Sequence, residues 1–436
     1  MKILKLAALL TAFALPVRAE IAIQTVTSPG GINAWLVEDH NIPFTALEIR
    51  FRGGTSLDDP SRRGAVNLMA ALIEEGTGDL DSAGFARARD SLAASFGFDS
   101  DDDAVSVSAR FLTENRDQAV DLLRRALVEP RFDQEAVDRV RGQVLANIRS
   151  EAKDQGDLAG KKLRAMSFGD HPYASSGDGT LETVAALTRD DVVAAHRDAL
   201  ARDRVYVAAA GDIDAQTLGL VIDKLLAGLP ETGKPLPPRA PMNLKGGITV
   251  VDFPGPQSTV LFAQEGVKRD DPDFFAASLL NEIVGGGRFS ARLMTEVREK
   301  RGLTYGIGSY LVGYDLAEMY MGQFSSANAT VGQAIEVIRD EWRRVAEEGV
   351  TEEELATAKT YMTGSYPLRF DGNGPIANIL VGMQMIGLGV DYPASRNDKV
   401  MAVTMEDIRR VARRLFRPDD LHFVVVGQPE GVTSTP

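Results

Sequence analysis

Apolar and polar positions follow two periods along this chain, and each change of period predicts an element. Alternation or short apolar runs predict strands at 35–37, 44–51, 104–111 and 205–210. Apolar positions three or four residues apart predict helices, beginning at Ala65 and covering 82–94, 116–128 and 133–152. The polar stretch 39–43 predicts a hairpin between the first two strands. Thr188 and Asp191 predict an N-terminal cap for a helix that precedes the last strand.

A proline-rich segment divides the chain, and the pattern before it returns after it. Residues 229–241, LPETGKPLPPRAP, hold five prolines among thirteen residues and predict a linker. Residues 188–211 match 404–427 at an offset of 216, and residues 118–120 match 333–335 at an offset of 215. Two matches in order predict a duplicated domain. We therefore expect an α+β fold of two homologous domains, each a largely antiparallel sheet with helices packed on one face. The expected domains are 20–228 and 242–430, followed by a tail at 431–436.

The second half contains a dense stretch, NEIVGGGRFSARLMTEVREKRGLTYGIGSY, at 281–310. Its pattern predicts an apolar helix that breaks at the three glycines 285–287, a second helix with Arg298 in its last turn, and a stop at Gly302. A strand is expected at 303–310, so Arg298 and Tyr305 could face one pocket. Spacing alone leaves a second interpretation open, because a cation suits any helix end and a strand tyrosine is usually core. No lysine follows the glycines as a phosphate loop requires.

The first nineteen residues have the layout of a cleaved signal peptide, with Lys2 and Lys5, an apolar run at 6–15 and a small-residue exit before Glu20. The protein is therefore expected to be exported, to the periplasm or beyond the cell. Cleavage removes three cations and no acid, so the formal net charge moves from −14 to −17, which disfavours nucleic acid as a partner. The apolar stretch 376–390 carries polar residues and glycines, and no membrane span is expected. With no cysteine, disulfides and thiolate metal sites are excluded.

Histidine and cysteine, the nitrogen and sulfur ligands of metals, are sparse. The four histidines are His40, His171, His196 and His422, and no two lie three to five residues apart, so no helix offers a pair of imidazoles. The acidic run 99–103 could attract calcium, but it lacks the glycine and distal glutamate of a calcium loop and fits a solvated strand entry better.

Two stretches, 51–77 and 285–309, resemble the pitrilysin/insulinase family of inverted-zincin metallopeptidases, in its short exported bacterial form related to the mitochondrial processing peptidase. The resemblance covers nearly the whole mature chain. Active members of that family read Gly-x-Ala-His-x-x-Glu-His in the first stretch, because two histidines one helical turn apart hold zinc and the glutamate activates the bound water.

The resemblance implies that the zinc motif is degenerate here. Asn67, Ala70 and Ala71 stand where histidine, glutamate and histidine are expected, and Asn147 stands at the position of the third ligand. We therefore expect no metal in this chain and no catalytic residue of its own.

In this family an arginine, and a tyrosine seven residues later, reach from the second domain to the zinc site of a facing chain and bind the substrate or its oxyanion. Arg298 and Tyr305 have that spacing, so the resemblance implies a non-catalytic subunit of a heterodimer, with zinc in the partner and a peptide or unfolded protein as substrate. An alternative is a peptide-binding scaffold or holdase without a role in proteolysis. An independent peptidase with a relocated metal is the third hypothesis.

Overall fold

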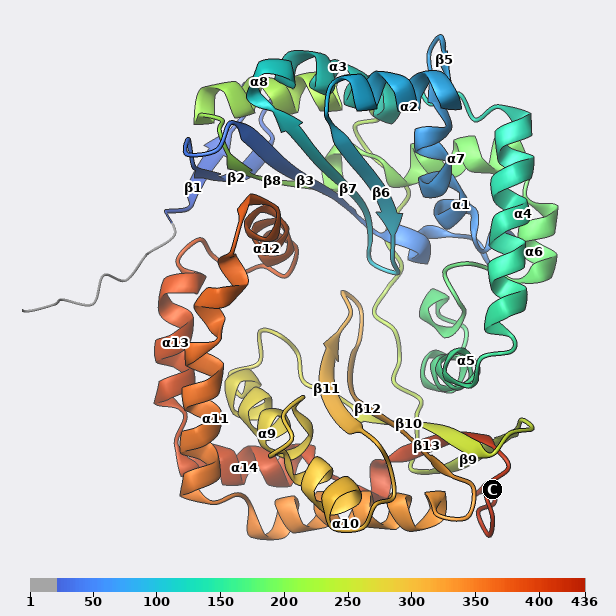
Figure 1. Cartoon of the computed structure of the whole chain (residues 1–436), viewed down its shortest axis with the longest axis vertical. Helices are drawn as coiled ribbons and strands as arrows, with labels where there is room; N and C mark the ends of the chain where they lie inside the picture. Colours follow the sequence, from blue (N-terminus) through green and yellow to red (C-terminus); the bar gives the residue numbers. More distant parts are fainter. Residues whose placement is uncertain (1–21, 436) are drawn as a thin grey trace, which may run out of the picture.

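The computed structural model describes residues 22–435 of the chain, which build two sheets in opposite halves of the molecule (Figure 1). The predicted signal peptide lies outside the described residues. Within the described range, no helix has the length and apolar character needed to cross a membrane.

The first sheet has six strands, and its neighbours pair in the order β1-β2-β8-β3-β7-β6. All neighbours are antiparallel except the parallel pair β2 and β8. The strands are β1 (Gln24–Thr27), β2 (Asn33–Glu38), β3 (Phe44–Arg52), β6 (Ser95–Ser100), β7 (Ala104–Leu112) and β8 (Val205–Gly211). Two short strands, β4 (Gly76–Thr77) and β5 (Leu80–Asp81), form a separate pair.

The second sheet has five strands in the order β11-β12-β10-β13-β9 and repeats the pairing pattern of the first. Its neighbours are antiparallel except for one parallel pair, β13 and β9. The strands are β9 (Gly247–Asp252), β10 (Gln257–Glu265), β11 (Ile307–Gly313), β12 (Glu318–Ala327) and β13 (His422–Gly427). The two sheets are therefore largely antiparallel, and the predicted fold class is confirmed.

Each half has helices of its own that share a hydrophobic core with one face of its sheet. In the first half these include α1 (Ala65–Leu72), α2 (Ser82–Ser91), α3 (Arg116–Val128), α4 (Gln134–Glu151), α6 (Leu181–Ala186), α7 (Arg189–Ala199) and α8 (Ala215–Leu226). In the second half they include α9 (Phe274–Gly285), a π-helix (Met294–Glu299), α10 (Val331–Glu348), α11 (Glu352–Gly364), α13 (Tyr392–Ala402) and α14 (Met405–Leu415).

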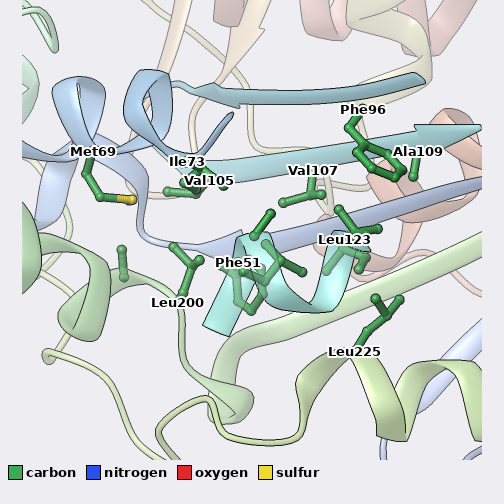
Figure 2. Packing of buried hydrophobic residues seen from close by; sticks show 14 of the residues in the cluster. Phe51, Met69, Ile73, Phe96, Val105, Val107, Ala109, Leu123, Leu200 and Leu225 are labelled. Atoms are coloured by element: carbon green, nitrogen blue, oxygen red, sulfur yellow. The ribbon is translucent and has the colours of Figure 1, made fainter. Parts of the chain in front are cut away.

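Alternation along β3 explains how the first core forms. Leu47, Ile49 and Phe51 are at most 1% exposed and belong to one buried cluster with Leu123 and Leu225 of the helices. Figure 2 shows Phe51 beside these two leucines. The intervening side chains point to the opposite face of the sheet.

The opposite face of each sheet is covered by a helix from the other half, which the pattern did not predict. Helix α12 (Asn373–Met385) of the second half packs on β8, β3 and β2, and α5 (Gln155–Phe168) of the first half packs on β10 and β13 (Figure 1). Small residues allow the first approach, because Ala46, Ala210 and Ala377 form one buried cluster. Each half thus completes the other.

The duplication is confirmed at its best-matched segments. Thr188 and Asp191 form a capping box at the start of α7, and Thr404 and Asp407 form the same box at the start of α14. Each helix leads into the buried strand, β8 or β13, that pairs with a parallel neighbour. The predicted linker, 229–241, adopts neither helix nor strand.

Two local predictions were wrong. Strands β2 and β3 do not form a hairpin, because β8 lies between them and pairs with both. The strand expected at 303–310 begins only at Ile307, because the Thr304 hydroxyl accepts from the Gly306 amide at 3.2 Å and donates to the carbonyls of Gly306 and Ser325, which makes a turn.

Candidate functional site

The degenerate motif lies on α1, where a buried carboxylate shapes the helix start. Asp58 accepts from the amides of Gly64 at 2.9 Å and Val66 at 3.0 Å. Burial raises the pKa of Asp58 to about 6, although these two hydrogen bonds and nearby Arg63 oppose the rise. Gly64 has φ 99°, and a Cβ there would lie 2.6 Å from the Asp178 carbonyl, so glycine is required.

The four motif positions present amide and methyl groups. Asn67 donates from Nδ2 to the Asp178 carboxylate at 3.0 Å and accepts from the Ser100 hydroxyl at 3.4 Å. Ala70 is buried and Ala71 is exposed on the same helix, while Asn147 is exposed on α4, which packs against α1. Zinc in proteins is held by imidazole, thiolate and carboxylate groups, so these four side chains do not fit the metal.

The four histidines are each held by neighbours with structural roles. His171 contacts the Pro238 carbonyl at 2.9 Å, His196 the Leu127 carbonyl at 2.8 Å, and His422 the Lys245 carbonyl at 2.6 Å. Burial lowers the pKa of each of these three, which favours the neutral ring. His40 pairs with Asp212 at 2.6 Å on the surface. Among residues 22–435, no three histidine, aspartate or glutamate side chains gather into a metal-binding group.

The glycine-rich stretch brings α9 against the edge strand β11. A Cβ at Gly285 would lie 1.9 Å from the Ser309 hydroxyl, so only glycine permits this approach. The π-helix ends at Glu299, and the turn after it closes at the predicted stop, where Gly302 has φ 63° and donates to the Arg298 carbonyl at 2.8 Å. The predicted apolar helix, glycine break and second helix are therefore confirmed.

The three cations near the end of the π-helix have different environments. Lys300 and Arg301 each lie 2.7 Å from the Glu296 carboxylate. Burial alone would raise the pKa of Glu296, but hydrogen bonds from these two cations outweigh it and hold the pKa at about 2. Arg298 instead stacks over Phe289, with its guanidinium carbon 4.7 Å from the ring centre. Within the described residues Arg298 has no carboxylate at ion-pair distance.

Tyr305 lies in the turn before β11 and is 90% exposed. It lines a groove of about 740 Å³ that follows β11, together with Gly308, Tyr310 and Gln323. Arg298 is half-buried and precedes this turn, but it is not among the described residues that line the groove. Strand β11 is at the edge of its sheet, so one side of its backbone is free of a partner strand.

The sequence did not identify the contacts that join the two halves around the acidic run 99–103. Asp102 accepts from Arg164 at 2.6 Å, and Tyr173 donates to the Asp103 carboxylate. Asp103 also accepts from the Asp315 amide of the second half at 3.0 Å. The interpretation as a solvated strand entry holds for Asp99 and Asp101, which are exposed, but not for Asp102 and Asp103, which arginine, tyrosine and backbone donors hold. Burial raises the pKa of Asp103 to about 6.

Comparison with known proteins agrees with this architecture. The protein-family model described as Insulinase (Peptidase family M16) matches residues 34–180. The family model described as Peptidase M16 inactive domain matches residues 186–362. The non-peptidase homolog YmxG of Helicobacter pylori is 25% identical over 389 residues, which is 89% of this chain and 90% of that protein. An uncharacterized zinc protease of Streptomyces coelicolor is 27% identical over 413 residues, which is 91% of this chain and 88% of that protein.

Solved structures give the same result. The crystal structure titled peptidase M16 inactive domain from Pseudomonas fluorescens superposes with a TM-score of 0.86 at 28% identity, over 95% of this chain and all of that chain. A protease from Helicobacter pylori superposes with a TM-score of 0.84 at 14% identity, over 93% of this chain and 99% of that one, and so shares the fold. The two matched models, the aligned relatives and the duplicated architecture together show that this chain belongs to peptidase family M16, the insulinase family.

Proposed function

We propose that this chain is the non-catalytic subunit of an exported two-chain zinc peptidase, in which it supplies Arg298 and Tyr305 to the active site of a zinc-bearing partner. The observation that carries the proposal is the exposure of Tyr305, whose side chain is 90% accessible at the rim of the β11 groove. A tyrosine in this position gains nothing from core packing, which favours a role toward another molecule.

The chemistry of the proposed role follows from the two side chains. A guanidinium and a phenolic hydroxyl are both hydrogen-bond donors, so they can stabilise the negative charge that develops on a peptide carbonyl oxygen during hydrolysis. The Arg298 guanidinium is available as a donor because it stacks on an aromatic ring and has no carboxylate at ion-pair distance among its described neighbours. The degenerate motif on α1 agrees with a division of labour, since this chain offers no zinc ligands at the four motif positions.

The substrate in this proposal is an extended peptide. An edge strand with an open backbone can accept a peptide as an added strand, and the groove beside β11 provides room for its side chains. The same groove also favours a second candidate, a peptide-binding scaffold or holdase that takes no part in proteolysis.

The test is peptide cleavage by this chain purified together with a zinc-bearing chain of the same family. Tyr305→Phe and Arg298→Ala should each lower kcat/KM by about a hundredfold, the typical effect of losing one oxyanion donor. The matched controls are Tyr361→Phe, a partly exposed tyrosine outside the groove, and Arg343→Ala, an exposed arginine on α10. Size-exclusion chromatography of each complex separates lost catalysis from lost assembly.

Two results would count against the proposal. Unchanged turnover in both Arg298→Ala and Tyr305→Phe complexes would remove the assisting role, and full activity of the zinc-bearing chain alone would favour the scaffold. Metal analysis provides an independent check, because stoichiometric zinc in this chain purified by itself would contradict the assignment of zinc to the partner.

A further inference from the structure

A second cavity opens between the two halves of this chain, and none of its lining residues belongs to the β11 groove. Its volume is about 710 Å³, which is within the range of small-ligand sites. Helix α12 contributes Ile379, Met383 and Met385 to one wall, and α9 contributes Phe274 and Phe275 to another. The cavity is therefore lined mainly by apolar side chains near these two helices.

Four arginines line the cavity, Arg50 of the first half and Arg269, Arg369 and Arg396 of the second. Arg50 donates to the Asn378 side chain at 2.5 Å, and Arg369 is exposed, so Arg269 and Arg396 are the two that stack on aromatic rings of the wall. Arg269 stacks with its guanidinium carbon 4.0 Å from the centre of the Phe274 ring, and its Nη2 donates to the Tyr392 hydroxyl at 2.5 Å. Arg396 is 9% exposed and stacks over Tyr366 at 4.5 Å. Its Nη1 donates to the Met362 carbonyl at 2.7 Å.

Neither Arg269 nor Arg396 has a carboxylate within 4.0 Å among residues 22–435. The nearby acids Asp271 and Asp273 lie 2.5–2.7 Å from Arg410 and Arg414 and are already compensated. Burial lowers the pKa of Arg396, which shows that its charge is held in an unfavourable environment, although an arginine stays protonated. A buried cation without a counter-charge is costly, and an anion in the cavity would relieve that cost.

The acids that line the cavity limit what the anion can be. Of Asp101, Asp102, Asp103 and Asp315, two are paired, Asp102 with Arg164 at 2.6 Å and Asp315 with Arg52 at 2.9 Å. Asp101 has no cation at ion-pair distance among residues 22–435, so its charge disfavours a ligand with several negative charges. The geometry points to a ligand with one carboxylate on an apolar body, held by Arg269 and Arg396 while the body lies against Met383, Met385 and Phe275. A guanidinium matches a carboxylate in two parallel hydrogen bonds, which gives the site its preference.

Two sources carry this chemistry, a fatty acid and the free C-terminus of a peptide that ends in an apolar residue. The test is isothermal titration of the mature chain at pH 8, with octanoate against octan-1-ol and an N-acetylated peptide ending in Leu-Phe against its C-terminal amide. At least one acid should bind about tenfold or more tightly than its neutral analogue, as expected for a charge-assisted pair. Whichever pair shows the difference identifies the source.

Variants locate the site. Arg269→Gln should lose about tenfold or more in affinity for the acid, and Arg269→Lys should recover part of it because the charge returns. Arg339→Gln is the matched control, since Arg339 stacks on Phe423 at 5.2 Å, pairs with Glu336 at 3.6 Å and lies outside the cavity. Arg396→Gln is informative only where thermal unfolding shows a folded protein, so Arg269 decides. Equal binding of acid and neutral analogue in both pairs, or wild-type affinity in Arg269→Gln, would overturn the inference.

Discussion

Removal of one hydroxyl, in Tyr173→Phe, should weaken the junction between the halves in a pH-dependent way. Tyr173 is fully buried, and its hydroxyl donates to the Asp103 carboxylate while accepting from the Leu316 amide at 3.2 Å. Asp103 also accepts from the Asp315 amide at 3.0 Å. The hydroxyl therefore connects a loop of the first half to the β11–β12 turn of the second.

The magnitude depends on whether Asp103 is ionised. Burial raises the pKa of this carboxyl from 3.8 to about 6, and the hydrogen bond from Tyr173 opposes the rise. Hydrogen bonds to a charged group contribute about 1.5–3 kcal/mol, and neutral ones about 0.5–1.5 kcal/mol. We expect Tyr173→Phe to lose about 2–3 kcal/mol at pH 8, where Asp103 is ionised, and about 1 kcal/mol at pH 5, where it is protonated.

The direction in which stability changes with pH follows from the linkage between proton binding and folding. A raised pKa means that the folded state binds the proton more tightly, so the wild type loses stability as the pH rises from about 4 to about 6. Without the hydroxyl the pKa of Asp103 rises further, so the variant goes on losing stability above pH 6, and its deficit relative to the wild type is larger at pH 8 than at pH 5.

Urea unfolding followed by circular dichroism at pH 5 and pH 8 measures both values. Tyr314→Phe is the control, because this ring packs 5.1 Å from Tyr173 and lacks a hydrogen bond from its hydroxyl within the described part of the chain. A cost for Tyr173→Phe that is equal at the two pH values, or no larger than that of the control, would refute the reasoning.

Three further predictions use the same unfolding assay. Burial raises the pKa of Glu48 to about 7, so Glu48→Gln should be more stable than the wild type at pH 8 and should converge with it below pH 5; a gap that does not vary with pH would contradict this. Thr188→Ala and Thr404→Ala each remove a capping hydroxyl and should cost about 1 kcal/mol, and a cost in only one of them would argue against equivalent caps. Leu380→Ala removes a fully buried side chain where α12 meets β8 and should lower the free energy of unfolding by about 2–5 kcal/mol. A loss below about 1 kcal/mol would show that α12 is loosely packed on the first sheet.

Features with a local cause could be predicted from the sequence. The capping boxes, the Gly302 stop and the glycine break after α9 each depend on residues within one helical turn, and each is present. The pairing of β2 with β8 joins Ala34 to Val207, which are separated by most of the first half of the sequence. The hydrophobic periodicity of a strand does not identify a partner so distant in sequence. The predicted hairpin was wrong for that reason.

The candidate site shows the same division. The resemblance led to Arg298 and Tyr305, but spacing does not reveal that Arg298 stacks on Phe289 or that Tyr305 precedes its strand. The cavity arginines could not be predicted, because Arg269 and Arg396 are distant in sequence and meet only after α13 packs beside α9. The sequence did contain an indication that a helix covers the second face of the first sheet. Ala46, Ala208 and Ala210 are small residues on the strand faces that α12 approaches.

The packing of α12 on the first sheet and of α5 on the second constrains how the proposed subunit can work. If the halves separated, α12 would leave an apolar face on the first sheet, and α5 would leave Leu261 and Val424 uncovered on the second. Opening by a hinge between the halves is therefore unfavourable, and a peptide has to use a site that is accessible while the halves stay together. The β11 edge meets that condition, because its groove and Tyr305 are accessible while α12 and α5 stay in place. The rigid junction would then hold Arg298 and Tyr305 in a constant position for a partner chain, which a flexible two-domain subunit could not do.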